Sequence, residues 1–299
     1  MNNLYTCRIK FVIGRIIILD MKECRHVLIL MLFAILLVIS GATVILSEDS
    51  KGAGSNGYDI NVITYNVCGL PDFITFDRGL APTKKRFSYI GKNLKQYDII
   101  GLQEAFIADR EIIEKSLKTH YVVHGTDVGT VKMLGSGVYT FSRWPVSRSH
   151  FEQWNYTGGP DALSHKGFVA ATVHVSKELA VDVYNLHGQT QWTDMKLKNY
   201  AQLANFMEYF SLGEGRPILL IGDFNCRLES EVCNYVIDRM NMEIAFPEQD
   251  HVDHIFFNEN YSGWKMSALS AGKSFVEKMG GKRISDHVAV ESVIRIEKK

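Results

Sequence analysis

Hydrophobic and polar positions after residue 58 alternate between two periods. Short runs of apolar, often β-branched residues predict strands at 59–65, 97–102, 137–141, 168–175, 181–186, 217–221, 251–257 and 288–294. Apolar residues that recur every three to four positions predict helices at 84–94, at 109–117 and after Thr193, where Gly213 ends the pattern. Because several strands follow one another without a helix between them, we expect two packed β-sheets with helices outside.

The N-terminus has a different pattern. Residues 27–46 are twenty residues without a charge, about the length needed to cross a bilayer. Basic residues precede this run within 1–26, and two acidic residues follow it, which places the rest of the chain outside the cytosol. The run is either a transmembrane anchor or a cleaved signal peptide. We therefore expect a membrane-anchored or secreted protein, with a flexible linker at 47–57 and one catalytic domain at 58–299.

Charge and cysteine content restrict the function. The chain has no net charge, and residues 58–299 hold 27 Lys and Arg against 29 Asp and Glu, a net charge of about −2. Since proteins that bind long duplex DNA usually carry a basic footprint, we expect no stable nucleic-acid partner. Only Cys68, Cys226 and Cys233 follow residue 46, and they form no Cys-x-x-Cys pair, so a thiolate zinc site is not expected. A disulfide between Cys226 and Cys233 stays open. Sequons at Asn155 and Asn260 agree with an extracytosolic domain.

Polar residues follow the buried strand 217–221, in the sequence ILLIGDFNC. Asp223 and Asn225 are two positions apart, so in an extended chain they share a face. The same pattern recurs at other strand ends and entries, with Asn66, Glu104, His187, Asp253, Asp286 and His287. Each residue alone also fits a turn, a cap or a solvated strand end. If the strand ends lie together, however, these side chains converge. By contrast, His251 and His254 point to opposite faces of a strand, so we do not expect them to bind a metal together.

The order of these motifs resembles the endonuclease/exonuclease/phosphatase superfamily. The matching pieces are TYN (64–66), LQE (102–104), NLH (185–187), GDFN (222–225), VDHIF (252–256) and SDH (285–287). The resemblance implies a four-layer α-β-β-α sandwich of two mixed β-sheets flanked by helices, here preceded by one N-terminal hydrophobic helix. It also implies a metal-dependent phosphoesterase.

The resemblance assigns a role to each of these residues. Glu104 is implied as the principal metal ligand, with Asn66 beside it and Asp286 completing the metal side. Oxygen ligands of this kind suit Mg²⁺, for which Mn²⁺ or Co²⁺ can substitute. The remaining implied roles concern the reaction: His287 as general base, Asp253 orienting it, Asp223 positioning the attacking water, and Asn225 and His187 binding the phosphoryl oxygens.

Two further stretches resemble neutral sphingomyelinases. They are SGVYTFSRWP (136–145) and DALSHKGF (161–168), in which Asp161 and Lys166 keep the spacing of a pair thought to switch a loop over the active site. The two residues also fit a plain surface turn. The resemblance implies a monomer that hydrolyses the membrane lipid sphingomyelin to ceramide and phosphocholine. An extracellular nuclease, another phosphoesterase of the superfamily and an inactive membrane-tethered binding module are the alternatives.

Aromatic residues leave the mode of lipid contact open. Trp154, Tyr156 and Trp192 fit either a choline site or plain packing, and packing is favoured. Trp264 and Phe275 look exposed within 262–279, the place where secreted bacterial sphingomyelinases insert an aromatic hairpin into lipid. The paired aromatic residues of such a hairpin are missing here, so docking through this segment is not predicted.

Overall fold

The computed structural model describes residues 57–127 and 132–299. The predicted basic segment (1–26), hydrophobic helix (27–46) and all but the last residue of the linker (47–57) lie outside the described residues. Within the described ranges, no helix is both long enough and apolar enough to cross a bilayer. The fold below therefore concerns the predicted catalytic domain alone.

The first sheet has six strands in the order β11-β14-β1-β2-β4-β3. Their bounds are β1 (Gly57–Asn66), β2 (Ile99–Gln103), β3 (Tyr121–His124), β4 (Tyr139–Ser142), β11 (Trp264–Ser274) and β14 (Ala289–Lys298). Strand β1 runs parallel to β2 and antiparallel to β14. The chain therefore leaves β1 and β2 at the same edge of the sheet at which it enters β14.

The second sheet also has six strands, in the order β5-β6-β7-β8-β10-β9. Their bounds are β5 (Val146–Gln153), β6 (Gly167–His174), β7 (Ala180–His187), β8 (Ile218–Asp223), β9 (Glu243–Ile244) and β10 (Asp253–Asn258). Strand β8 is parallel to β7 and antiparallel to β10. The ends of β7 and β8 thus meet the start of β10, which repeats the arrangement at the edge of the first sheet.

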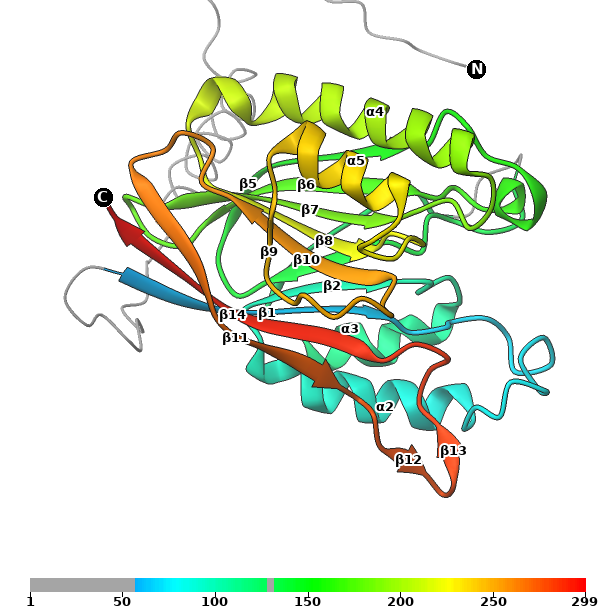
Figure 1. Cartoon of the computed structure of the whole chain (residues 1–299). Helices are drawn as coiled ribbons and strands as arrows, with labels where there is room; N and C mark the ends of the chain where they lie inside the picture. The colour runs from blue at the N-terminus through cyan, green and yellow to red at the C-terminus, as the bar shows by residue number, and fades with distance from the viewer. Residues whose placement is uncertain (1–56, 128–131) are drawn as a thin grey trace, which may run out of the picture. The chain divides into compact units, whose positions relative to one another are not determined.

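Helices cover the outer face of each sheet. They are α2 (Thr83–Asn93), α3 (Glu111–Ser116), α4 (Thr193–Phe210) and α5 (Glu231–Met240). Figure 1 shows α4 and α5 over the second sheet and α2 and α3 over the first. Short 3₁₀ turns lie at Leu94–Gln96, Ala108–Arg110, Gly159–Leu163 and Leu212–Glu214, and a small hairpin pairs β12 (Lys278–Met279) with β13 (Lys282–Arg283).

Three hydrophobic clusters hold these layers together. The central one lies between the sheets and joins Val62 of the first sheet to Leu219 and Ile255 of the second. The two outer clusters lie beneath the helix pairs. Since each fully buried large apolar side chain contributes roughly 1.5–3 kcal/mol, these clusters provide the main driving force for folding. The predicted α-β-β-α sandwich of mixed sheets is confirmed for the described residues.

Elements outside the predicted ranges are mostly at sheet edges. Strands β5 and β11 lie at sheet edges, so each pairs with a neighbouring strand on one side only. They contain many polar residues, and the alternation of apolar and polar residues along them is weak. Helix α5 carries stronger sequence features, with Ser230 as its N-cap and Val232, Val236 and Met240 buried on one face. These apolar residues recur every four positions, as in a helix, but the helix is only ten residues long and was not predicted.

The two sequons differ in accessibility. Asn155 is exposed, as a glycan acceptor must be. Asn260 is buried, and its side-chain nitrogen donates to the carbonyl oxygens of Ser211 and Arg216, each at 2.9 Å. A glycan on that nitrogen would break both hydrogen bonds, so in the folded domain only the sequon at Asn155 offers an accessible acceptor.

The disulfide left open by the sequence is not formed. Cys68, Cys226 and Cys233 are free and buried. Cys226 and Cys233 do lie in contact, and a hydrogen bond to Cys233, together with burial, raises the pKa of the Cys226 thiol. The described domain is therefore held together by packing and hydrogen bonds without a cross-link.

Candidate active site

The strand ends bring the predicted residues into one site. Asn66 ends β1, Glu104 follows β2, His187 ends β7, Asp223 ends β8, Asp253 begins β10, and His287 precedes β14. The register places Asp223 opposite both His187 and Asp253 on neighbouring strands. Side chains from the first sheet reach this group across the gap between the two sheets, since Asn66 donates to Asp223 Oδ2 at 3.0 Å. The predicted convergence is therefore present.

The ends of β1 and β8 each form the same type of turn. At β1, the backbone N–H of Cys68 donates to Asn66 Oδ1 at 3.0 Å, and at β8 the N–H of Asn225 donates to Asp223 Oδ1 at 2.9 Å. The third residue of each turn, Cys68 or Asn225, has a left-handed backbone, with φ of 47° and 51° respectively. These are Asx turns, in which a side chain replaces a backbone acceptor. They fix the orientation of Asn66 and Asp223 and stop each strand.

This turn corrects the geometry expected for Asn225. An extended chain would project Asn225 beside Asp223, but the left-handed backbone takes it out of the strand. Its side-chain nitrogen donates to the Gly188 carbonyl at 3.1 Å, and its own carbonyl accepts from Lys196 Nζ at 2.6 Å. Asn225 thus lies at the site, with one amide hydrogen engaged by the loop after β7. The alternative of an Asx turn, which the sequence leaves open, is the one that the structure adopts.

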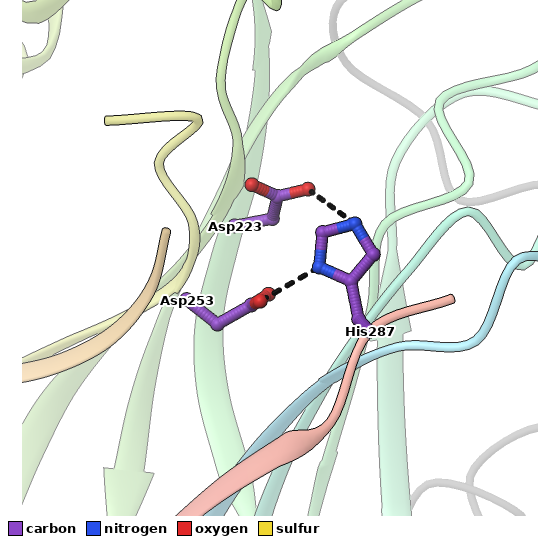
Figure 2. Close-up of side chains that lie close together, drawn as sticks. All are labelled: Asp223, Asp253 and His287. Carbon is purple, nitrogen blue, oxygen red and sulfur yellow. Dashed lines mark hydrogen bonds and ion pairs between the residues drawn. The ribbon is translucent and has the colours of Figure 1, made fainter. Parts of the chain in front are cut away.

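A carboxylate–imidazole pair lies at the centre of the site (Figure 2). His287 Nδ1 is 2.7 Å from Asp253 Oδ2, and His287 Nε2 is 3.9 Å from Asp223 Oδ2. Asp253 therefore orients the ring so that Nε2 faces the remaining site. This arrangement agrees with the geometry that a general base and its orienting carboxylate require.

Neighbouring carboxylates control the protonation of His287. Burial alone disfavours the charged imidazole, but the carboxylates of Asp253, Asp223 and Asp286 outweigh burial and raise the pKa of His287 to about 10. Burial also raises the pKa of Asp253 to about 6, although the His287 charge opposes that rise. The pair is therefore a charged ion pair at neutral pH in the protein alone.

Glu104 occupies an unusual backbone position. Its φ is 55°, and its carbonyl oxygen accepts from the Gly69 N–H at 2.8 Å. A Cβ at Gly69 would lie 2.3 Å from that oxygen, so only glycine permits this approach between the loops after β1 and β2. Asn66 donates to Glu104 Oε1 at 3.2 Å, which confirms that Asn66 lies beside Glu104. Burial raises the pKa of Glu104, while the Lys166 charge opposes it.

His187 is buried between the two acidic residues. Its Nε2 lies 3.6 Å from Asp223 Oδ2 and 3.9 Å from Glu104 Oε1, and its Nδ1 is buried without a hydrogen-bond partner. Burial, followed by the charge of Lys166, lowers the pKa of His187 well below its usual value. The ring is therefore neutral and can present an N–H to an anionic ligand. Trp154 supports it from below, donating to the His187 carbonyl at 2.7 Å, which confirms a packing role for Trp154.

Asp286 lies at the outer rim of the site. Arg78 Nη1 is 2.7 Å from Asp286 Oδ2, and the two side chains are partly exposed. Burial acts against the charged carboxyl, but His287 and Arg78 lower the pKa of Asp286 below its ordinary value. Arg78 was not among the residues predicted for the site. It lies in a loop without regular pattern, twelve residues after Asn66, so only its charge in TFDRG (75–79) singles it out.

Asp161 and Lys166 form a buried ion pair. Lys166 Nζ lies 2.7 Å from Asp161 Oδ1, and both side chains are less than one tenth exposed. Asp161 also accepts from the N–H and hydroxyl of Thr190, and Lys166 donates to the carbonyl of Gly188. The surface-turn alternative is therefore wrong. The pair binds the loop that follows His187, and the charge of Lys166 acts on both Glu104 and His187.

Several polar residues proved structural. Gln103 donates to Asn185 Oδ1 at 2.7 Å and so joins the two sheets directly beneath the site. His254 is buried, and its Nε2 lies 2.8 Å from the Cys226 carbonyl oxygen. Its ring stacks against Phe256, which agrees with the expectation that His251 and His254 do not form a metal pair. From the sequence alone such polar residues look like candidates for the site, because their hydrogen-bond partners are known only once the chain has folded.

The two aromatic residues that looked exposed near residue 270 are not. Phe275 is buried and stacks on Tyr65 with ring centroids 4.8 Å apart. Trp264 is half-buried and packs edge-on against Tyr58. Tyr156 and Trp192, by contrast, are about half exposed. The segment 262–279 therefore offers its aromatic rings to the core.

The donor set fits a hard divalent cation. The carboxylates of Asp223 and Asp286 lie close enough to Glu104 for their charges to act on it, and the buried Asp253 Oδ1 has no hydrogen-bond partner. The atoms of Asp223, Asp253 and His287 lie within 4.8 Å of one another, close enough to share an ion. Because His287 and Asp253 already satisfy each other, the more open Glu104 side has more room for a divalent cation. Asn66 turns its amide nitrogen toward the carboxylates and its oxygen toward the backbone N–H of Cys68.

Comparisons with known proteins agree with this site. Residues 63–287 match the model of the "Endonuclease/Exonuclease/phosphatase family". A protein named Sphingomyelinase from Mycobacterium bovis is 31% identical over 180 residues, which are 58% of this chain and 35% of that protein. The chain thus spans about a third of the length of the curated relatives that it matches first.

Solved structures share the fold. Sphingomyelinase C from Streptomyces griseocarneus superposes with a TM-score of 0.63 at 17% identity, covering 79% of this chain and 99% of that chain. A Staphylococcus aureus beta toxin mutant with bound magnesium ions gives a TM-score of 0.63 at 15% identity, with coverage of 79% and 99%. At such identities the likeness is one of fold.

Proposed function

Since this chain belongs to the endonuclease/exonuclease/phosphatase family, a family of phosphoesterases, we propose that it is a Mg²⁺-dependent phosphodiesterase of the phospholipase C type. The proposed substrate is sphingomyelin, and the products are ceramide and phosphocholine. The observation that carries the chemistry is the single site in which the His287–Asp253 pair faces Glu104, Asp223 and His187. The choice of lipid is supported by curated relatives named as sphingomyelinases.

His287 and Asp253 supply the proton transfer. The carboxylate of Asp253 holds Nδ1 of the ring, which leaves Nε2 free to take a proton from water. Asp223 Oδ2 lies 3.9 Å from that nitrogen and accepts from Asn66, so it is placed to orient the same water. The water oxygen bonds to phosphorus as the bond between phosphorus and the ceramide oxygen breaks. The departing oxygen takes up a proton from solvent, and His287 returns the proton that it accepted to solvent.

Neutral donors surround the position of the phosphate. The pKa of His187 is lowered by burial, so the ring is neutral and donates a hydrogen bond through an N–H without carrying a charge. The free amide hydrogen of Asn225 is the second donor. Such fixed donors stabilise the negative charge that develops on phosphoryl oxygens in the transition state. Lys166 adds positive charge close to Glu104 and His187 but is itself held by Asp161.

Glu104 and Asp286 would hold the Mg²⁺ ion, which would supply positive charge beside the phosphoryl oxygens. Asn66 would orient Glu104 through the hydrogen bond that it donates to Oε1. Of these carboxylates, Asp286 is one of the groups that raise the pKa of His287. Positive charge beside Asp286 would therefore lower that pKa and favour a ring that can accept a proton. The raised pKa of His287 in the metal-free protein is thus compatible with a role as base when the metal is bound.

The N-terminal segment belongs to the same proposal. A hydrophobic run at 27–46, whether it is retained as an anchor or cleaved, would deliver the domain to the extracytosolic side. We place the enzyme there as a monomer acting at a lipid surface.

Release of phosphocholine from sphingomyelin tests the function. We expect release with Mg²⁺, none with EDTA, and restored release when Mg²⁺ or Mn²⁺ is added back. Plasmid DNA under the same conditions is the comparison, because the family also contains nucleases. Nicking of DNA without release of phosphocholine would reject sphingomyelin as the substrate and favour the nuclease alternative.

A further inference from the structure

The loop between β1 and α2 exposes three large apolar side chains. Phe73 and Phe76 are 77% and 82% exposed, and Ile74 between them is 48% exposed. Isolated exposed apolar residues are common, but three within four positions form a patch of the kind that marks an interaction site. The partner must offer an apolar environment to aromatic rings that the domain itself leaves in water.

The loop is held in this conformation by its own hydrogen bonds. The N–H of Ile74 donates to Pro71, that of Arg78 donates to Thr75, and Asp72 accepts from the N–H of Thr83 at the start of α2. Thr75 is buried while its neighbours on both sides are exposed. The rings therefore point outward because the turn directs them outward.

A cationic hairpin adjoins this patch. The N–H of Arg283 on β13 donates to Gly79, and that of Ala81 donates to Arg283, each at 3.0 Å, so the hairpin and the loop are joined by backbone. Residues 71–85 and 276–283 together carry six Lys and Arg against three Asp and Glu, a net charge of +3 in a domain that is slightly acidic overall. The exposed cations are Lys84, Lys85, Lys278, Lys282 and Arg283.

An open groove lies between hairpin and helix. Its volume is ≈ 410 Å³, and its lining includes Lys84, Lys85 and Lys92 of α2 and Met279 of β12. Three ammonium groups beside Met279 and the ring of Tyr89 suit an anionic lipid head group. Aromatic rings beside clustered lysines form the composition that binds anionic lipid surfaces.

The patch is adjacent to the catalytic residues. Figure 1 shows the loop projecting beyond the C-terminal end of β1, where Asn66 lies. Arg78, in the same loop, pairs with Asp286 at 2.7 Å, and Asp286 precedes His287. A surface that contacted Phe73 and Phe76 would therefore lie next to the site.

We propose that the β1–α2 loop and the β12–β13 hairpin dock the domain on an anionic lipid bilayer, with Phe73 and Phe76 entering the interface and the lysines contacting lipid phosphates. The proposal rests on the proposed function only in that a lipid substrate lies in such a surface. The aromatic rings of the segment 262–279, Trp264 and Phe275, pack inward, so that segment contributes to docking only through the hairpin that begins at Lys278.

Hydrogen exchange on the full chain tests the contact itself. The probe is vesicles of phosphatidylcholine with or without phosphatidylserine. We expect peptides covering 71–80 and 276–283 to gain protection on vesicles with phosphatidylserine, and to lose much of it at high salt. The His287→Ala variant must show the same protection. This readout decides the proposal even if no sphingomyelin is hydrolysed, and unchanged exchange in both peptides overturns it.

Kinetics supply the second measurement. The Phe73→Ser/Phe76→Ser variant should lower hydrolysis of sphingomyelin in phosphatidylserine vesicles roughly tenfold, while hydrolysis of monomeric short-chain sphingomyelin is retained. Tyr209→Ser is the matched control, because Tyr209 is 83% exposed on α4. An equal loss on both substrates, or protection of the loop by self-association without vesicles, would show that the patch does not dock lipid.

Discussion

The two halves of the catalytic site differ in their contact with solvent. The second sheet contributes His187, Asp223 and Asp253, whose side chains are 1–3% exposed. From the first sheet come the buried Asn66 and three more open side chains, Glu104, Asp286 and His287, which are 19–25% exposed. The chemical types are the same, acids and an imidazole, but one half is enclosed and the other is open. The difference indicates a division of labour between them.

The enclosed half is fixed by strand register. Asp223 lies opposite both His187 and Asp253 in the ladders of the second sheet, so their spacing follows from β-pairing. The open half depends on loops, with Glu104 in a left-handed conformation and Asp286 held by Arg78. A fixed half suits orientation of the base and the water. The open half suits ligands that must enter and leave, such as a cation and a head group.

Removing His287 should break the link between the halves. His287 comes from the open half but is oriented by Asp253 of the enclosed half. We expect His287→Ala to lower kcat by about 10²–10⁴-fold, the range of general acid–base catalysis. Phosphocholine release at saturating sphingomyelin measures the effect.

The control is His174→Ala, since His174 is an exposed histidine on β6. Its activity should equal that of the unaltered protein. Retention of full activity in His287→Ala, with the fold confirmed by circular dichroism, would remove His287 from the mechanism.

Changing Glu104 should affect the open half alone. In Glu104→Gln the hydrogen bond from Asn66 has an equivalent acceptor, but the charge that attracts a cation is lost. We expect the Mg²⁺ concentration for half-maximal activity to rise roughly 10- to 100-fold. Calorimetric titration of Mg²⁺ into the protein gives a measurement that is independent of turnover.

Glu111→Gln, at an exposed position on α3, is the matched loss of one charge. Should both variants bind Mg²⁺ with unaltered affinity, Glu104 is not a ligand, and the ion belongs with Asp223, Asp253 and His287.

The enclosed half was the part that the sequence predicted best. Asp223 and Asp253 lie at the ends of apolar strands, whose alternation is visible without a structure, and the layers follow from the same pattern. The open half was predicted by residue but not by environment. The pairing of Arg78 with Asp286 joins residues more than two hundred positions apart, and no local pattern contains it.

Burial explains the other differences. Asp161 and Lys166 fit a surface turn by their composition, but the loop after His187 closes over them. Phe73 and Phe275 are the same residue type, and only tertiary packing exposes the first and buries the second. Hydrophobic pattern identifies elements, whereas the partner of a single side chain depends on where the elements pack.

The smallest expected effect concerns the pKa of His287, to which carboxylates of both halves contribute. Enclosed Asp253 and Asp223 and open Asp286 all raise it to about 10 from an ordinary value of 6.5. Because the raised value belongs to the folded state, the stabilisation is complete below pH 6.5 and is lost as pH rises through 10. In EDTA, the thermal stability of the unaltered protein relative to His287→Ala should therefore fall across this window.

Mg²⁺ distinguishes the contributions of the two halves to this pKa. An ion on the open side neutralises charge near His287, so its NMR titration should move to lower pH when Mg²⁺ is added. The shift should be absent in Glu104→Gln at the same Mg²⁺ concentration. A His287 pKa near 6.5 in EDTA would show that Asp253, Asp223 and Asp286 do not stabilise a charged imidazole, because a neutral ring can also donate from Nδ1 to Asp253 across the 2.7 Å contact. The two halves would then be linked through the orientation of His287 and not through its charge.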